Sequence, residues 1–312
     1  MKRNIILLFT ALCFSGIAAS PLSATMYIVP ETGSRLIGSN VQHYVQRDGR
    51  SLESIATEYD VGLLALMQAN PSVDPFLPAP GMTLIIPQQI LLPDVPREGI
   101  IVNLSEMRLY FFPKNQNTVH VYPVGIGQVD DDTVTPVMKT TIVQKREDPT
   151  WTPTANIRKR YLEQGIVLPA VVPAGEDNPM GHHALRLGAY GGVYLIHGTN
   201  ADFGIGMRVS SGCIRLRNTD IEALFKAVPI GTLVRILNEP VKVSAEPDGA
   251  VYVEVHQPLS ESLSDDPKTR PIILNASVKK RLQSQAISVI AFDKAMENRT
   301  GLPTVINEKE SI

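Results

Sequence analysis

Residues 194–199 read YLIHGT and residues 210–216 read SSGCIRL, with a short loop between them. The first stretch predicts a strand that ends at His197, and the second predicts a strand that opens at Cys213. These two side chains meet if the loop lets the strands lie side by side. A thiol is a poor nucleophile at its ordinary pKa of ~8.5, and a neighbouring imidazole can hold it as the thiolate. We therefore expect Cys213 to be a nucleophile and His197 to be its base.

Gly212 stands directly before the expected nucleophile. A glycine at this position lets a substrate approach the main chain closely. The amides of Gly212 and Cys213 can then donate to the oxygen of a tetrahedral intermediate. This arrangement fits acyl transfer through a thioester.

The same residue types allow two other interpretations. One is an inert buried thiol beside a core histidine, which the Ser-Ser-Gly turn before Cys213 disfavours. The other is a zinc site of His182, His183, His197 and Cys213. Adjacent side chains of an extended chain point to opposite faces, and no closely spaced ligand pair supports such a site. We therefore predict no metal and no cofactor.

Short apolar runs with Gly and Pro turns surround this motif, and they predict a mostly β sandwich with few helices. Residues 145–190 are rich in proline and lack periodicity, so we expect an irregular insertion that forms a lid or a substrate wall. One helix is expected at 218–227, capped by Asn218 or Thr219. The expected strands are 100–104, 107–112, 119–126, 133–142, 192–196, 213–216 and 233–237.

Residues 41–88 form a smaller unit with the order β-α-α-β. Ser51 can cap a helix whose apolar residues recur at helical spacing up to Tyr59, and a second short helix stops at Asn70-Pro71. A strand at 83–86 closes the unit. Beyond residue 238 the sequence predicts a strand at 251–255 and a single helix over 276–297, which either packs against the catalytic domain or serves as a docking element.

The N-terminus has the pattern of a secretory signal peptide. Lys2 and Arg3 precede an apolar run from Ile5 to Ala19, and cleavage is expected after Ala24. This run is shorter than the ~20 residues that span a bilayer, so no membrane span is predicted. With 29 basic and 31 acidic residues, the chain has no positive excess that would favour nucleic acid as a partner.

Residues 41–88 resemble the LysM peptidoglycan-binding module over nearly their full length. The resemblance implies binding of a glycan that contains N-acetylglucosamine. It rests on His43-Tyr44-Val45, Gly49, Ser51-Leu52, Ile55-Ala56, Tyr59, Asn70-Pro71 and Pro80-Gly81 through Pro87.

Residues 98–238 resemble the YkuD-type L,D-transpeptidase catalytic domain, and residues 239–312 follow as a C-terminal extension. The match rests on the two stretches quoted above, with Gly206, Thr135-Pro136, Pro149-Thr150-Trp151 and Asn178-Pro179-Met180-Gly181. Ser211 stands where many relatives have a second histidine, and Met138 replaces a glycine that often follows Thr-Pro. The combined α+β, mostly β chain is similar to the enterobacterial ErfK/YbiS/YcfS/YnhG group.

The resemblance implies attack by Cys213 on the diaminopimelate carbonyl of a peptidoglycan tetrapeptide stem, with release of D-alanine. His197 would be base and then acid, and the main-chain oxygen of Gly198 would orient its ring. An amine then resolves the thioester. Residues expected to bind substrate or to line the cleft are Ser210, Ser211, Arg215, Tyr190, His182 and His183.

The acceptor amine implied by the group is the C-terminal lysine of Braun lipoprotein in the periplasm. Cross-linking of two diaminopimelate residues and hydrolysis by water are the enzymatic alternatives. A wall-binding protein with an idle thiol is the non-enzymatic one. An oxidoreductase that keeps Cys213 reduced would be a partner in this compartment.

Overall fold

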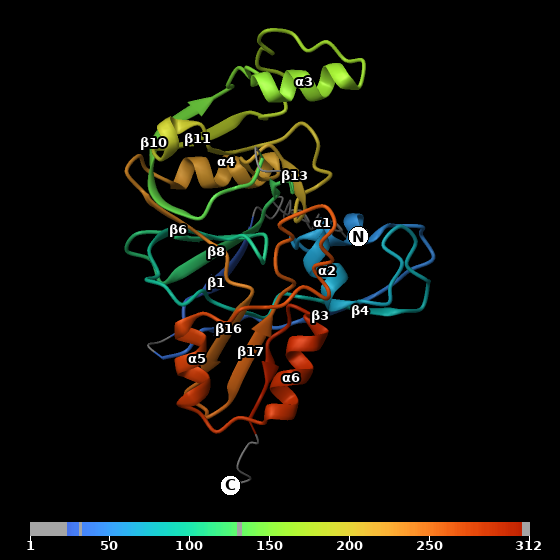
Figure 1. The fold of residues 1–312 in the computed structure, drawn as a ribbon, viewed down its shortest axis with the longest axis vertical. Coiled ribbons are helices and arrows are strands. Elements are labelled where there is room, and N and C mark those ends of the chain that lie inside the picture. Colours follow the sequence, from blue (N-terminus) through green and yellow to red (C-terminus); the bar gives the residue numbers. More distant parts are fainter. Residues whose placement is uncertain (1–23, 31–32, 130–132, 308–312) are drawn as a thin grey trace, which may run out of the picture.

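The structure is a computed structural model that describes residues 24–30, 33–129 and 133–307 (Figure 1). The expected signal peptide lies outside these residues except for Ala24. The largest feature is a nine-stranded mixed sheet. Its strands in spatial order are β1 (Thr25–Ile28), β8 (Thr118–Pro123), β7 (Arg108–Phe112), β6 (Gly99–Asn103), β15 (Leu233–Leu237), β10 (Met138–Glu147), β11 (His183–Leu187), β12 (Leu195–His197) and β14 (Ile214–Arg215).

This sheet curls around one apolar core. Tyr122 of β8 and Ile196 of β12, which lie far apart in the strand order, belong to the same buried cluster as Leu224 of α4 (Asn218–Ala227). A bridge between Gly125 and Arg215 brings the end of β14 back to the chain that leaves β8. β9 (Ile126–Gly127) then pairs in parallel with β13 (Arg208–Ser210). The mostly β architecture is confirmed, but the sandwich is made by one curled sheet instead of two.

Helix α4 and strand β15 have the bounds that the sequence predicts. The cap of α4 was expected at Asn218 or Thr219, but it is Arg217, whose side chain makes no capping hydrogen bond. The Asn218 side chain is used elsewhere, since its amide donates to the Thr199 carbonyl at 2.7 Å. The loop after β12 is thereby tied to α4.

Segment 145–190 is more ordered than its prolines suggest. It contains α3 (Ala155–Glu163), which Thr154 caps by accepting from the Ile157 amide, and β11. Ile157 is the one buried residue of α3, so the helix shows no apolar periodicity in the sequence. The strand expected at 133–142 lies later, at β10, where it pairs with β11 and β15. A short 3-10 helix, η1 (Tyr190–Gly192), precedes β12.

The predicted β-α-α-β order of the smaller unit is confirmed. It consists of β3 (Val41–Tyr44), α1 (Leu52–Glu58), α2 (Leu63–Ala69) and β4 (Thr83–Ile86), and β3 pairs with β4. The Asn70 side chain donates to the Leu66 and Ile85 carbonyls at 2.8 and 2.9 Å, which ends α2 against β4. Nearby, β2 (Leu36–Ile37) pairs with β5 (Ile90–Leu91).

The C-terminal part forms a separate three-stranded sheet of β16 (Val241–Ala245), β17 (Val251–Val255) and β18 (Thr304–Val305). The single helix expected over 276–297 is wrong, because the chain makes two helices, α5 (Ala276–Gln283) and α6 (Val289–Asn298). Ser288 breaks the run by capping α6. Both helices pack on this sheet (Figure 1): Val278 of α5 is buried in its core, and Phe292 and Met296 of α6 are partly buried against it.

Candidate active site

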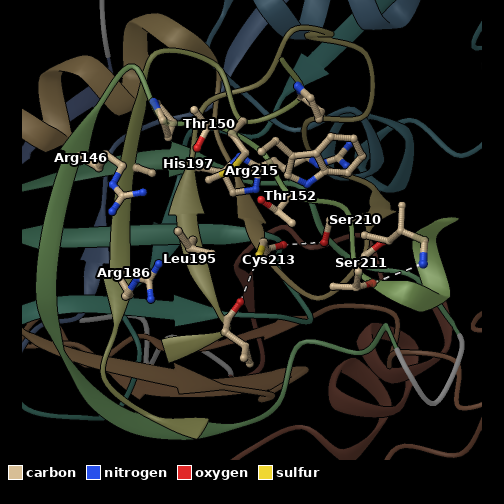
Figure 2. A pocket seen from close by; sticks show the side chains of 18 of the residues that line it. Arg146, Thr150, Thr152, Arg186, Leu195, His197, Ser210, Ser211, Cys213 and Arg215 are labelled. Carbon is tan, nitrogen blue, oxygen red and sulfur yellow. Dashed lines mark hydrogen bonds between the residues drawn. The ribbon is translucent and has the colours of Figure 1, made fainter. Parts of the chain in front are cut away.

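The two quoted stretches lie side by side as parallel strands. In β12 and β14, Ile196 is opposite Ile214 and His197 is opposite Arg215. Because side chains alternate along a strand, the two isoleucines enter the core while His197 and Arg215 face the other way. Cys213 precedes β14 on this second face, and the three residues line one cavity of about 350 Å³ (Figure 2).

The segment before β11 supplies the wall of this cavity, as the sequence predicts. Trp151 and neighbouring threonines stand on one side, and Ile157 and Tyr161 reach it from α3. Sequence reasoning gave no role to α3, because its cavity residues are isolated in the sequence. The full set of lining residues is Gln144, Arg146, Pro149, Thr150, Trp151, Thr152, Thr154, Ile157, Tyr161, Pro179, Met180, Ala184, Arg186, Val193, Leu195, His197, Ser210, Ser211, Cys213 and Arg215.

His197 is buried, with 5% of its surface exposed. Its Nδ1 donates to the carbonyl of Gly198 at 2.6 Å, which is the contact that the resemblance implies. Burial, together with the charge of Arg215, lowers the pKa of this imidazole to about 4, against the raising effect of hydrogen bonds to the Gly198 and Met180 backbone. At neutral pH the ring is therefore uncharged. Its proton sits on Nδ1, so Nε2 has the free lone pair that a base requires.

Cys213 is half-buried, and its thiol lies 4.0 Å from the Val193 carbonyl, to which it donates. Burial raises the pKa of the thiol, against the opposing effects of the Leu195 amide and of Arg215. Both groups are therefore uncharged at neutral pH, and the thiol's hydrogen bond goes to Val193 and not to His197. This corrects the expectation of a thiolate held by an imidazole, since desolvation disfavours both charged forms.

The turn before Cys213 is held by its own hydrogen bonds. Ser210 is 1% exposed; its hydroxyl donates to the Cys213 carbonyl at 2.5 Å and accepts from the Gly212 amide at 3.1 Å. The Gly212 amide is thus engaged inside the turn and does not stand ready as an oxyanion donor. Gly212 has φ +102°, and a Cβ there would lie 3.0 Å from the Tyr194 ring. Ser210 shapes the turn, whereas Ser211 accepts from Arg160 of α3 at 2.7 Å.

Three residues expected at the cleft lie elsewhere. His182 contacts Asp148 at 2.9 Å, and the His183 ring lies 4.8 Å from that of Phe225. Both line a separate hollow with Asn218 and Glu222 of α4. Ala184 of β11 faces the cavity, so the neighbouring His183 points to the other face of the sheet. Tyr190 is 61% exposed and makes an edge contact with Tyr194 without lining the cavity.

The geometry gives no support to the zinc alternative, since His182 and His183 lie away from His197 and Cys213. Among the described residues, the one cluster of at least three potential ligand atoms within reach of one ion is Glu106, Glu254 and His256. The ammonium of Lys242 already lies 2.9 Å from both carboxylates, so a protein cation occupies that place.

Comparison with known proteins gives this site its context. Residues 97–236 match the family model of the L,D-transpeptidase catalytic domain. Over 292 residues the chain is 59% identical to the probable L,D-transpeptidase YcfS of Escherichia coli K12, covering 94% of this chain and 91% of that protein. The chain belongs to the L,D-transpeptidase family. It is therefore an enzyme, and the interpretation as a wall-binding protein with an idle thiol is set aside.

Further matches cover the rest of this L,D-transpeptidase. Residues 240–306 match the L,D-transpeptidase C-terminal domain, which accounts for the three-stranded sheet and its two helices. The chain is 50% identical to the probable L,D-transpeptidase YbiS of E. coli K12, over 92% of this chain and 94% of that protein. It is 46% identical to the probable L,D-transpeptidase ErfK/SrfK of the same organism, over 98% of both. Within the described ranges no helix is long and apolar enough to cross a membrane.

Proposed function

We propose that this enzyme acylates Cys213 with a peptidoglycan tetrapeptide stem at diaminopimelate, releases D-alanine and transfers the acyl group to an amine. The observation that carries the proposal is the parallel pairing of β12 and β14, which puts Cys213 and His197 on one face of one cavity. The Gly198 carbonyl holds the imidazole with Nε2 unprotonated. A thiol and a base in one cavity suit acyl transfer.

The proposed first step starts from the neutral pair. The Cys213 sulfur forms a bond to the diaminopimelate carbonyl carbon while its proton passes to His197 Nε2. The imidazolium then gives that proton to the leaving D-alanine amine as the C–N bond breaks. Starting from neutral groups avoids a buried charge pair in the free enzyme.

The second step reverses the first with a different amine. The acceptor attacks the thioester carbonyl, its proton passes to His197, and the Cys213 thiol is regenerated. The Cys213 amide is the proposed oxyanion donor, since the Gly212 amide is held by Ser210. The amide bond to the acceptor replaces the amide bond to D-alanine that the first step breaks, and D-alanine is the released product.

For the acceptor we propose the C-terminal lysine of Braun lipoprotein. Support comes from similarity to the YcfS, YbiS and ErfK group over nearly the whole chain. Muropeptide analysis of a strain that expresses this enzyme alone is the test. Lysine-containing adducts are expected. Direct diaminopimelate–diaminopimelate links, or trimmed stems from attack by water, would reassign the acceptor.

The cellular setting is part of the proposal. Residues 1–24 would direct export to the periplasm, where a thiol reductant would keep Cys213 reduced. The β-α-α-β unit at 41–88 would act as a LysM module that binds wall glycan. Sedimentation of the purified protein with insoluble peptidoglycan tests the last point. Retention that survives Cys213→Ala supports glycan binding, and loss of retention on that change would assign it to the active site instead.

The central test is mass spectrometry of the enzyme trapped with its tetrapeptide donor. An adduct on Cys213 with the mass of the stem less D-alanine is expected. Cys213→Ala should form no adduct. If that variant is still labelled, the nucleophile is another residue.

A further inference from the structure

The cavity around Cys213 is lined by positive side chains. Arg146, Arg186 and Arg215 contribute to its lining, and no carboxylate does (Figure 2). Within residues 24–30, 33–129 and 133–307, Arg146 and Arg186 have no ion pair and no hydrogen bond from their side chains. Arg186 is half-buried and Arg146 is exposed, and guanidinium groups that line a cavity without a protein partner favour an anionic ligand.

Strand register fixes where these arginines lie relative to the thiol. Arg186 of β11 is opposite Leu195 of β12. Ile196 is opposite Ile214, so Leu195 lies one residue before that pair, at the level of Cys213, which precedes β14. Neighbouring strands are about 4.8 Å apart, so Arg186 stands two strands, roughly 10 Å, from the nucleophile. Arg146 of β10 lies one strand further out. It is opposite Ala184 of β11, which is in turn opposite His197 of β12.

Two small residues leave room along this path. Ala184 lies between Arg146 and His197, and its small side chain leaves the space between them open. Gly192 of η1 has φ +77°, and a Cβ there would approach Arg186 Cδ to 3.1 Å. The Arg186 side chain therefore packs against the backbone of Gly192, which has no side chain to displace it.

We propose that Arg186 and Arg146 form a carboxylate subsite that recognises the acyl donor at a distance from the attacked carbonyl. This inference rests on the proposed function. An extended chain advances about 1.2 Å per bond. The distal carboxylate of diaminopimelate is six bonds from the attacked carbonyl and therefore lies roughly 7 Å from it. The α-carboxylate of D-glutamate is seven bonds away, at roughly 8 Å. Both spans are shorter than the roughly 10 Å between the backbones of Arg186 and Cys213, and the long Arg186 side chain can bridge the difference. The carboxylate of the leaving D-alanine, three bonds away, lies too close for Arg186 and within the range of Arg215.

The test measures acylation of the full-length enzyme with no acceptor present, so that only the donor contributes. Four donors are compared: the native tetrapeptide, one amidated at the distal diaminopimelate carboxyl, one amidated at the D-glutamate α-carboxyl, and one amidated at both. Arg186→Gln and Arg146→Gln are compared with Lys139→Gln, which removes an exposed positive charge from β10 outside the cavity. Alkylation of Cys213 by neutral iodoacetamide reports whether each variant keeps an intact site.

We expect wild type to use one amidated donor about 10- to 100-fold less well than the native donor, in KM more than in kcat. The carboxyl whose amidation causes this loss is the one that is recognised. Arg186→Gln should lose a similar factor on the native donor and nothing further on that amidated donor, and Arg186→Lys should recover part of the loss. Lys139→Gln should behave as wild type.

If wild type is acylated equally well by all four donors, the proposed subsite is wrong. This comparison uses wild-type protein alone and does not depend on whether any variant folds. An equal loss by Arg186→Gln on native and amidated donors would also overturn it. If wild type is acylated by none of the donors although iodoacetamide alkylates Cys213, then the proposed function itself fails.

Discussion

At the scale of single residues, the pair of Cys213 and His197 decides how the enzyme responds to pH. Burial lowers the pKa of His197 to about 4 and raises that of the Cys213 thiol. Acylation by the donor needs a neutral imidazole, so its rate should rise as pH increases through about 4 and stay flat through neutrality. Alkylation of the free enzyme by iodoacetamide needs a thiolate and should rise only in the alkaline range. A plateau of fast alkylation at neutral pH that His197→Ala removes would show a thiolate–imidazolium pair instead.

The role of His197 can be separated from that of nearby histidines. His197→Ala should lower the acylation rate about 10²- to 10⁴-fold, because the thiol then loses its proton acceptor. His182→Ala is the matched control, since His182 contacts Asp148 in a different hollow and should retain the wild-type rate. Donor-dependent release of D-alanine measures both. Similar losses in the two variants would remove His197 from the proposed chemistry.

At the scale of elements, the sequence predicts those parts whose own residues carry a signal. The helix at 218–227 and the closing strand at 83–86 have the predicted bounds, and the second helix of the smaller unit stops at Asn70 as predicted, although the cap of α4 differs from the prediction. Helix α3 buries only Ile157, so nothing periodic marks it. From the sequence, the pairing of β12 with β14 is only the condition under which Cys213 and His197 can meet, and the structure fulfils it. By contrast, the partner of the Gly212 amide depends on the local turn, and the neutral state of Cys213 depends on burial by residues distant in sequence.

Helix α4 also carries a carboxylate whose surroundings are unfavourable for its charge. Asp220 is 1% exposed, and its ion-pair partner Arg217 lies 3.9 Å away, beyond hydrogen-bond distance. Burial raises the pKa of Asp220 to about 7, with Asp60 of the α1–α2 turn adding to the effect. The penalised form is the charged one, so this residue destabilises the fold progressively as pH rises from its unfolded value of 3.8 to about 7.

Asp220→Asn should remove this pH-dependent cost. We expect the variant to gain stability over wild type at pH above 7, on the order of 4 kcal/mol, and to lose that advantage in acid. Urea unfolding of both proteins at acid and alkaline pH gives the difference, in which the other titrating groups cancel. A difference that stays constant with pH would contradict the raised pKa of Asp220.

At the scale of the whole molecule, a buried ion cluster joins the C-terminal sheet to the catalytic sheet. Lys242 of β16 lies 2.9 Å from Glu106, next to β7, and from Glu254 of β17, and these three side chains are fully buried. Arg108 lies 3.2 Å from both carboxylates, and His256 contacts Glu254 at 2.6 Å. Lys242 contacts Glu106 and Glu254 contacts Arg108 across the boundary between the two units, so the two units should unfold together.

Lys242→Met should break this connection, because it leaves two buried carboxylates with too little positive charge. The expected loss is about 3–5 kcal/mol in the free energy of unfolding at neutral pH. Lys226→Met is the matched control, since Lys226 pairs with Glu222 on an exposed face and should cost less than about 1 kcal/mol. In wild type the cluster holds the pKa of Glu254 far below its ordinary value of 4.5, so its stabilisation is present above that pH and is lost only in strong acid. In Lys242→Met the carboxylates take up protons more readily, so the loss measured by urea unfolding should shrink as pH falls. A loss equal to that of Lys226→Met, or one independent of pH, would mean that the cluster does not hold the two sheets together.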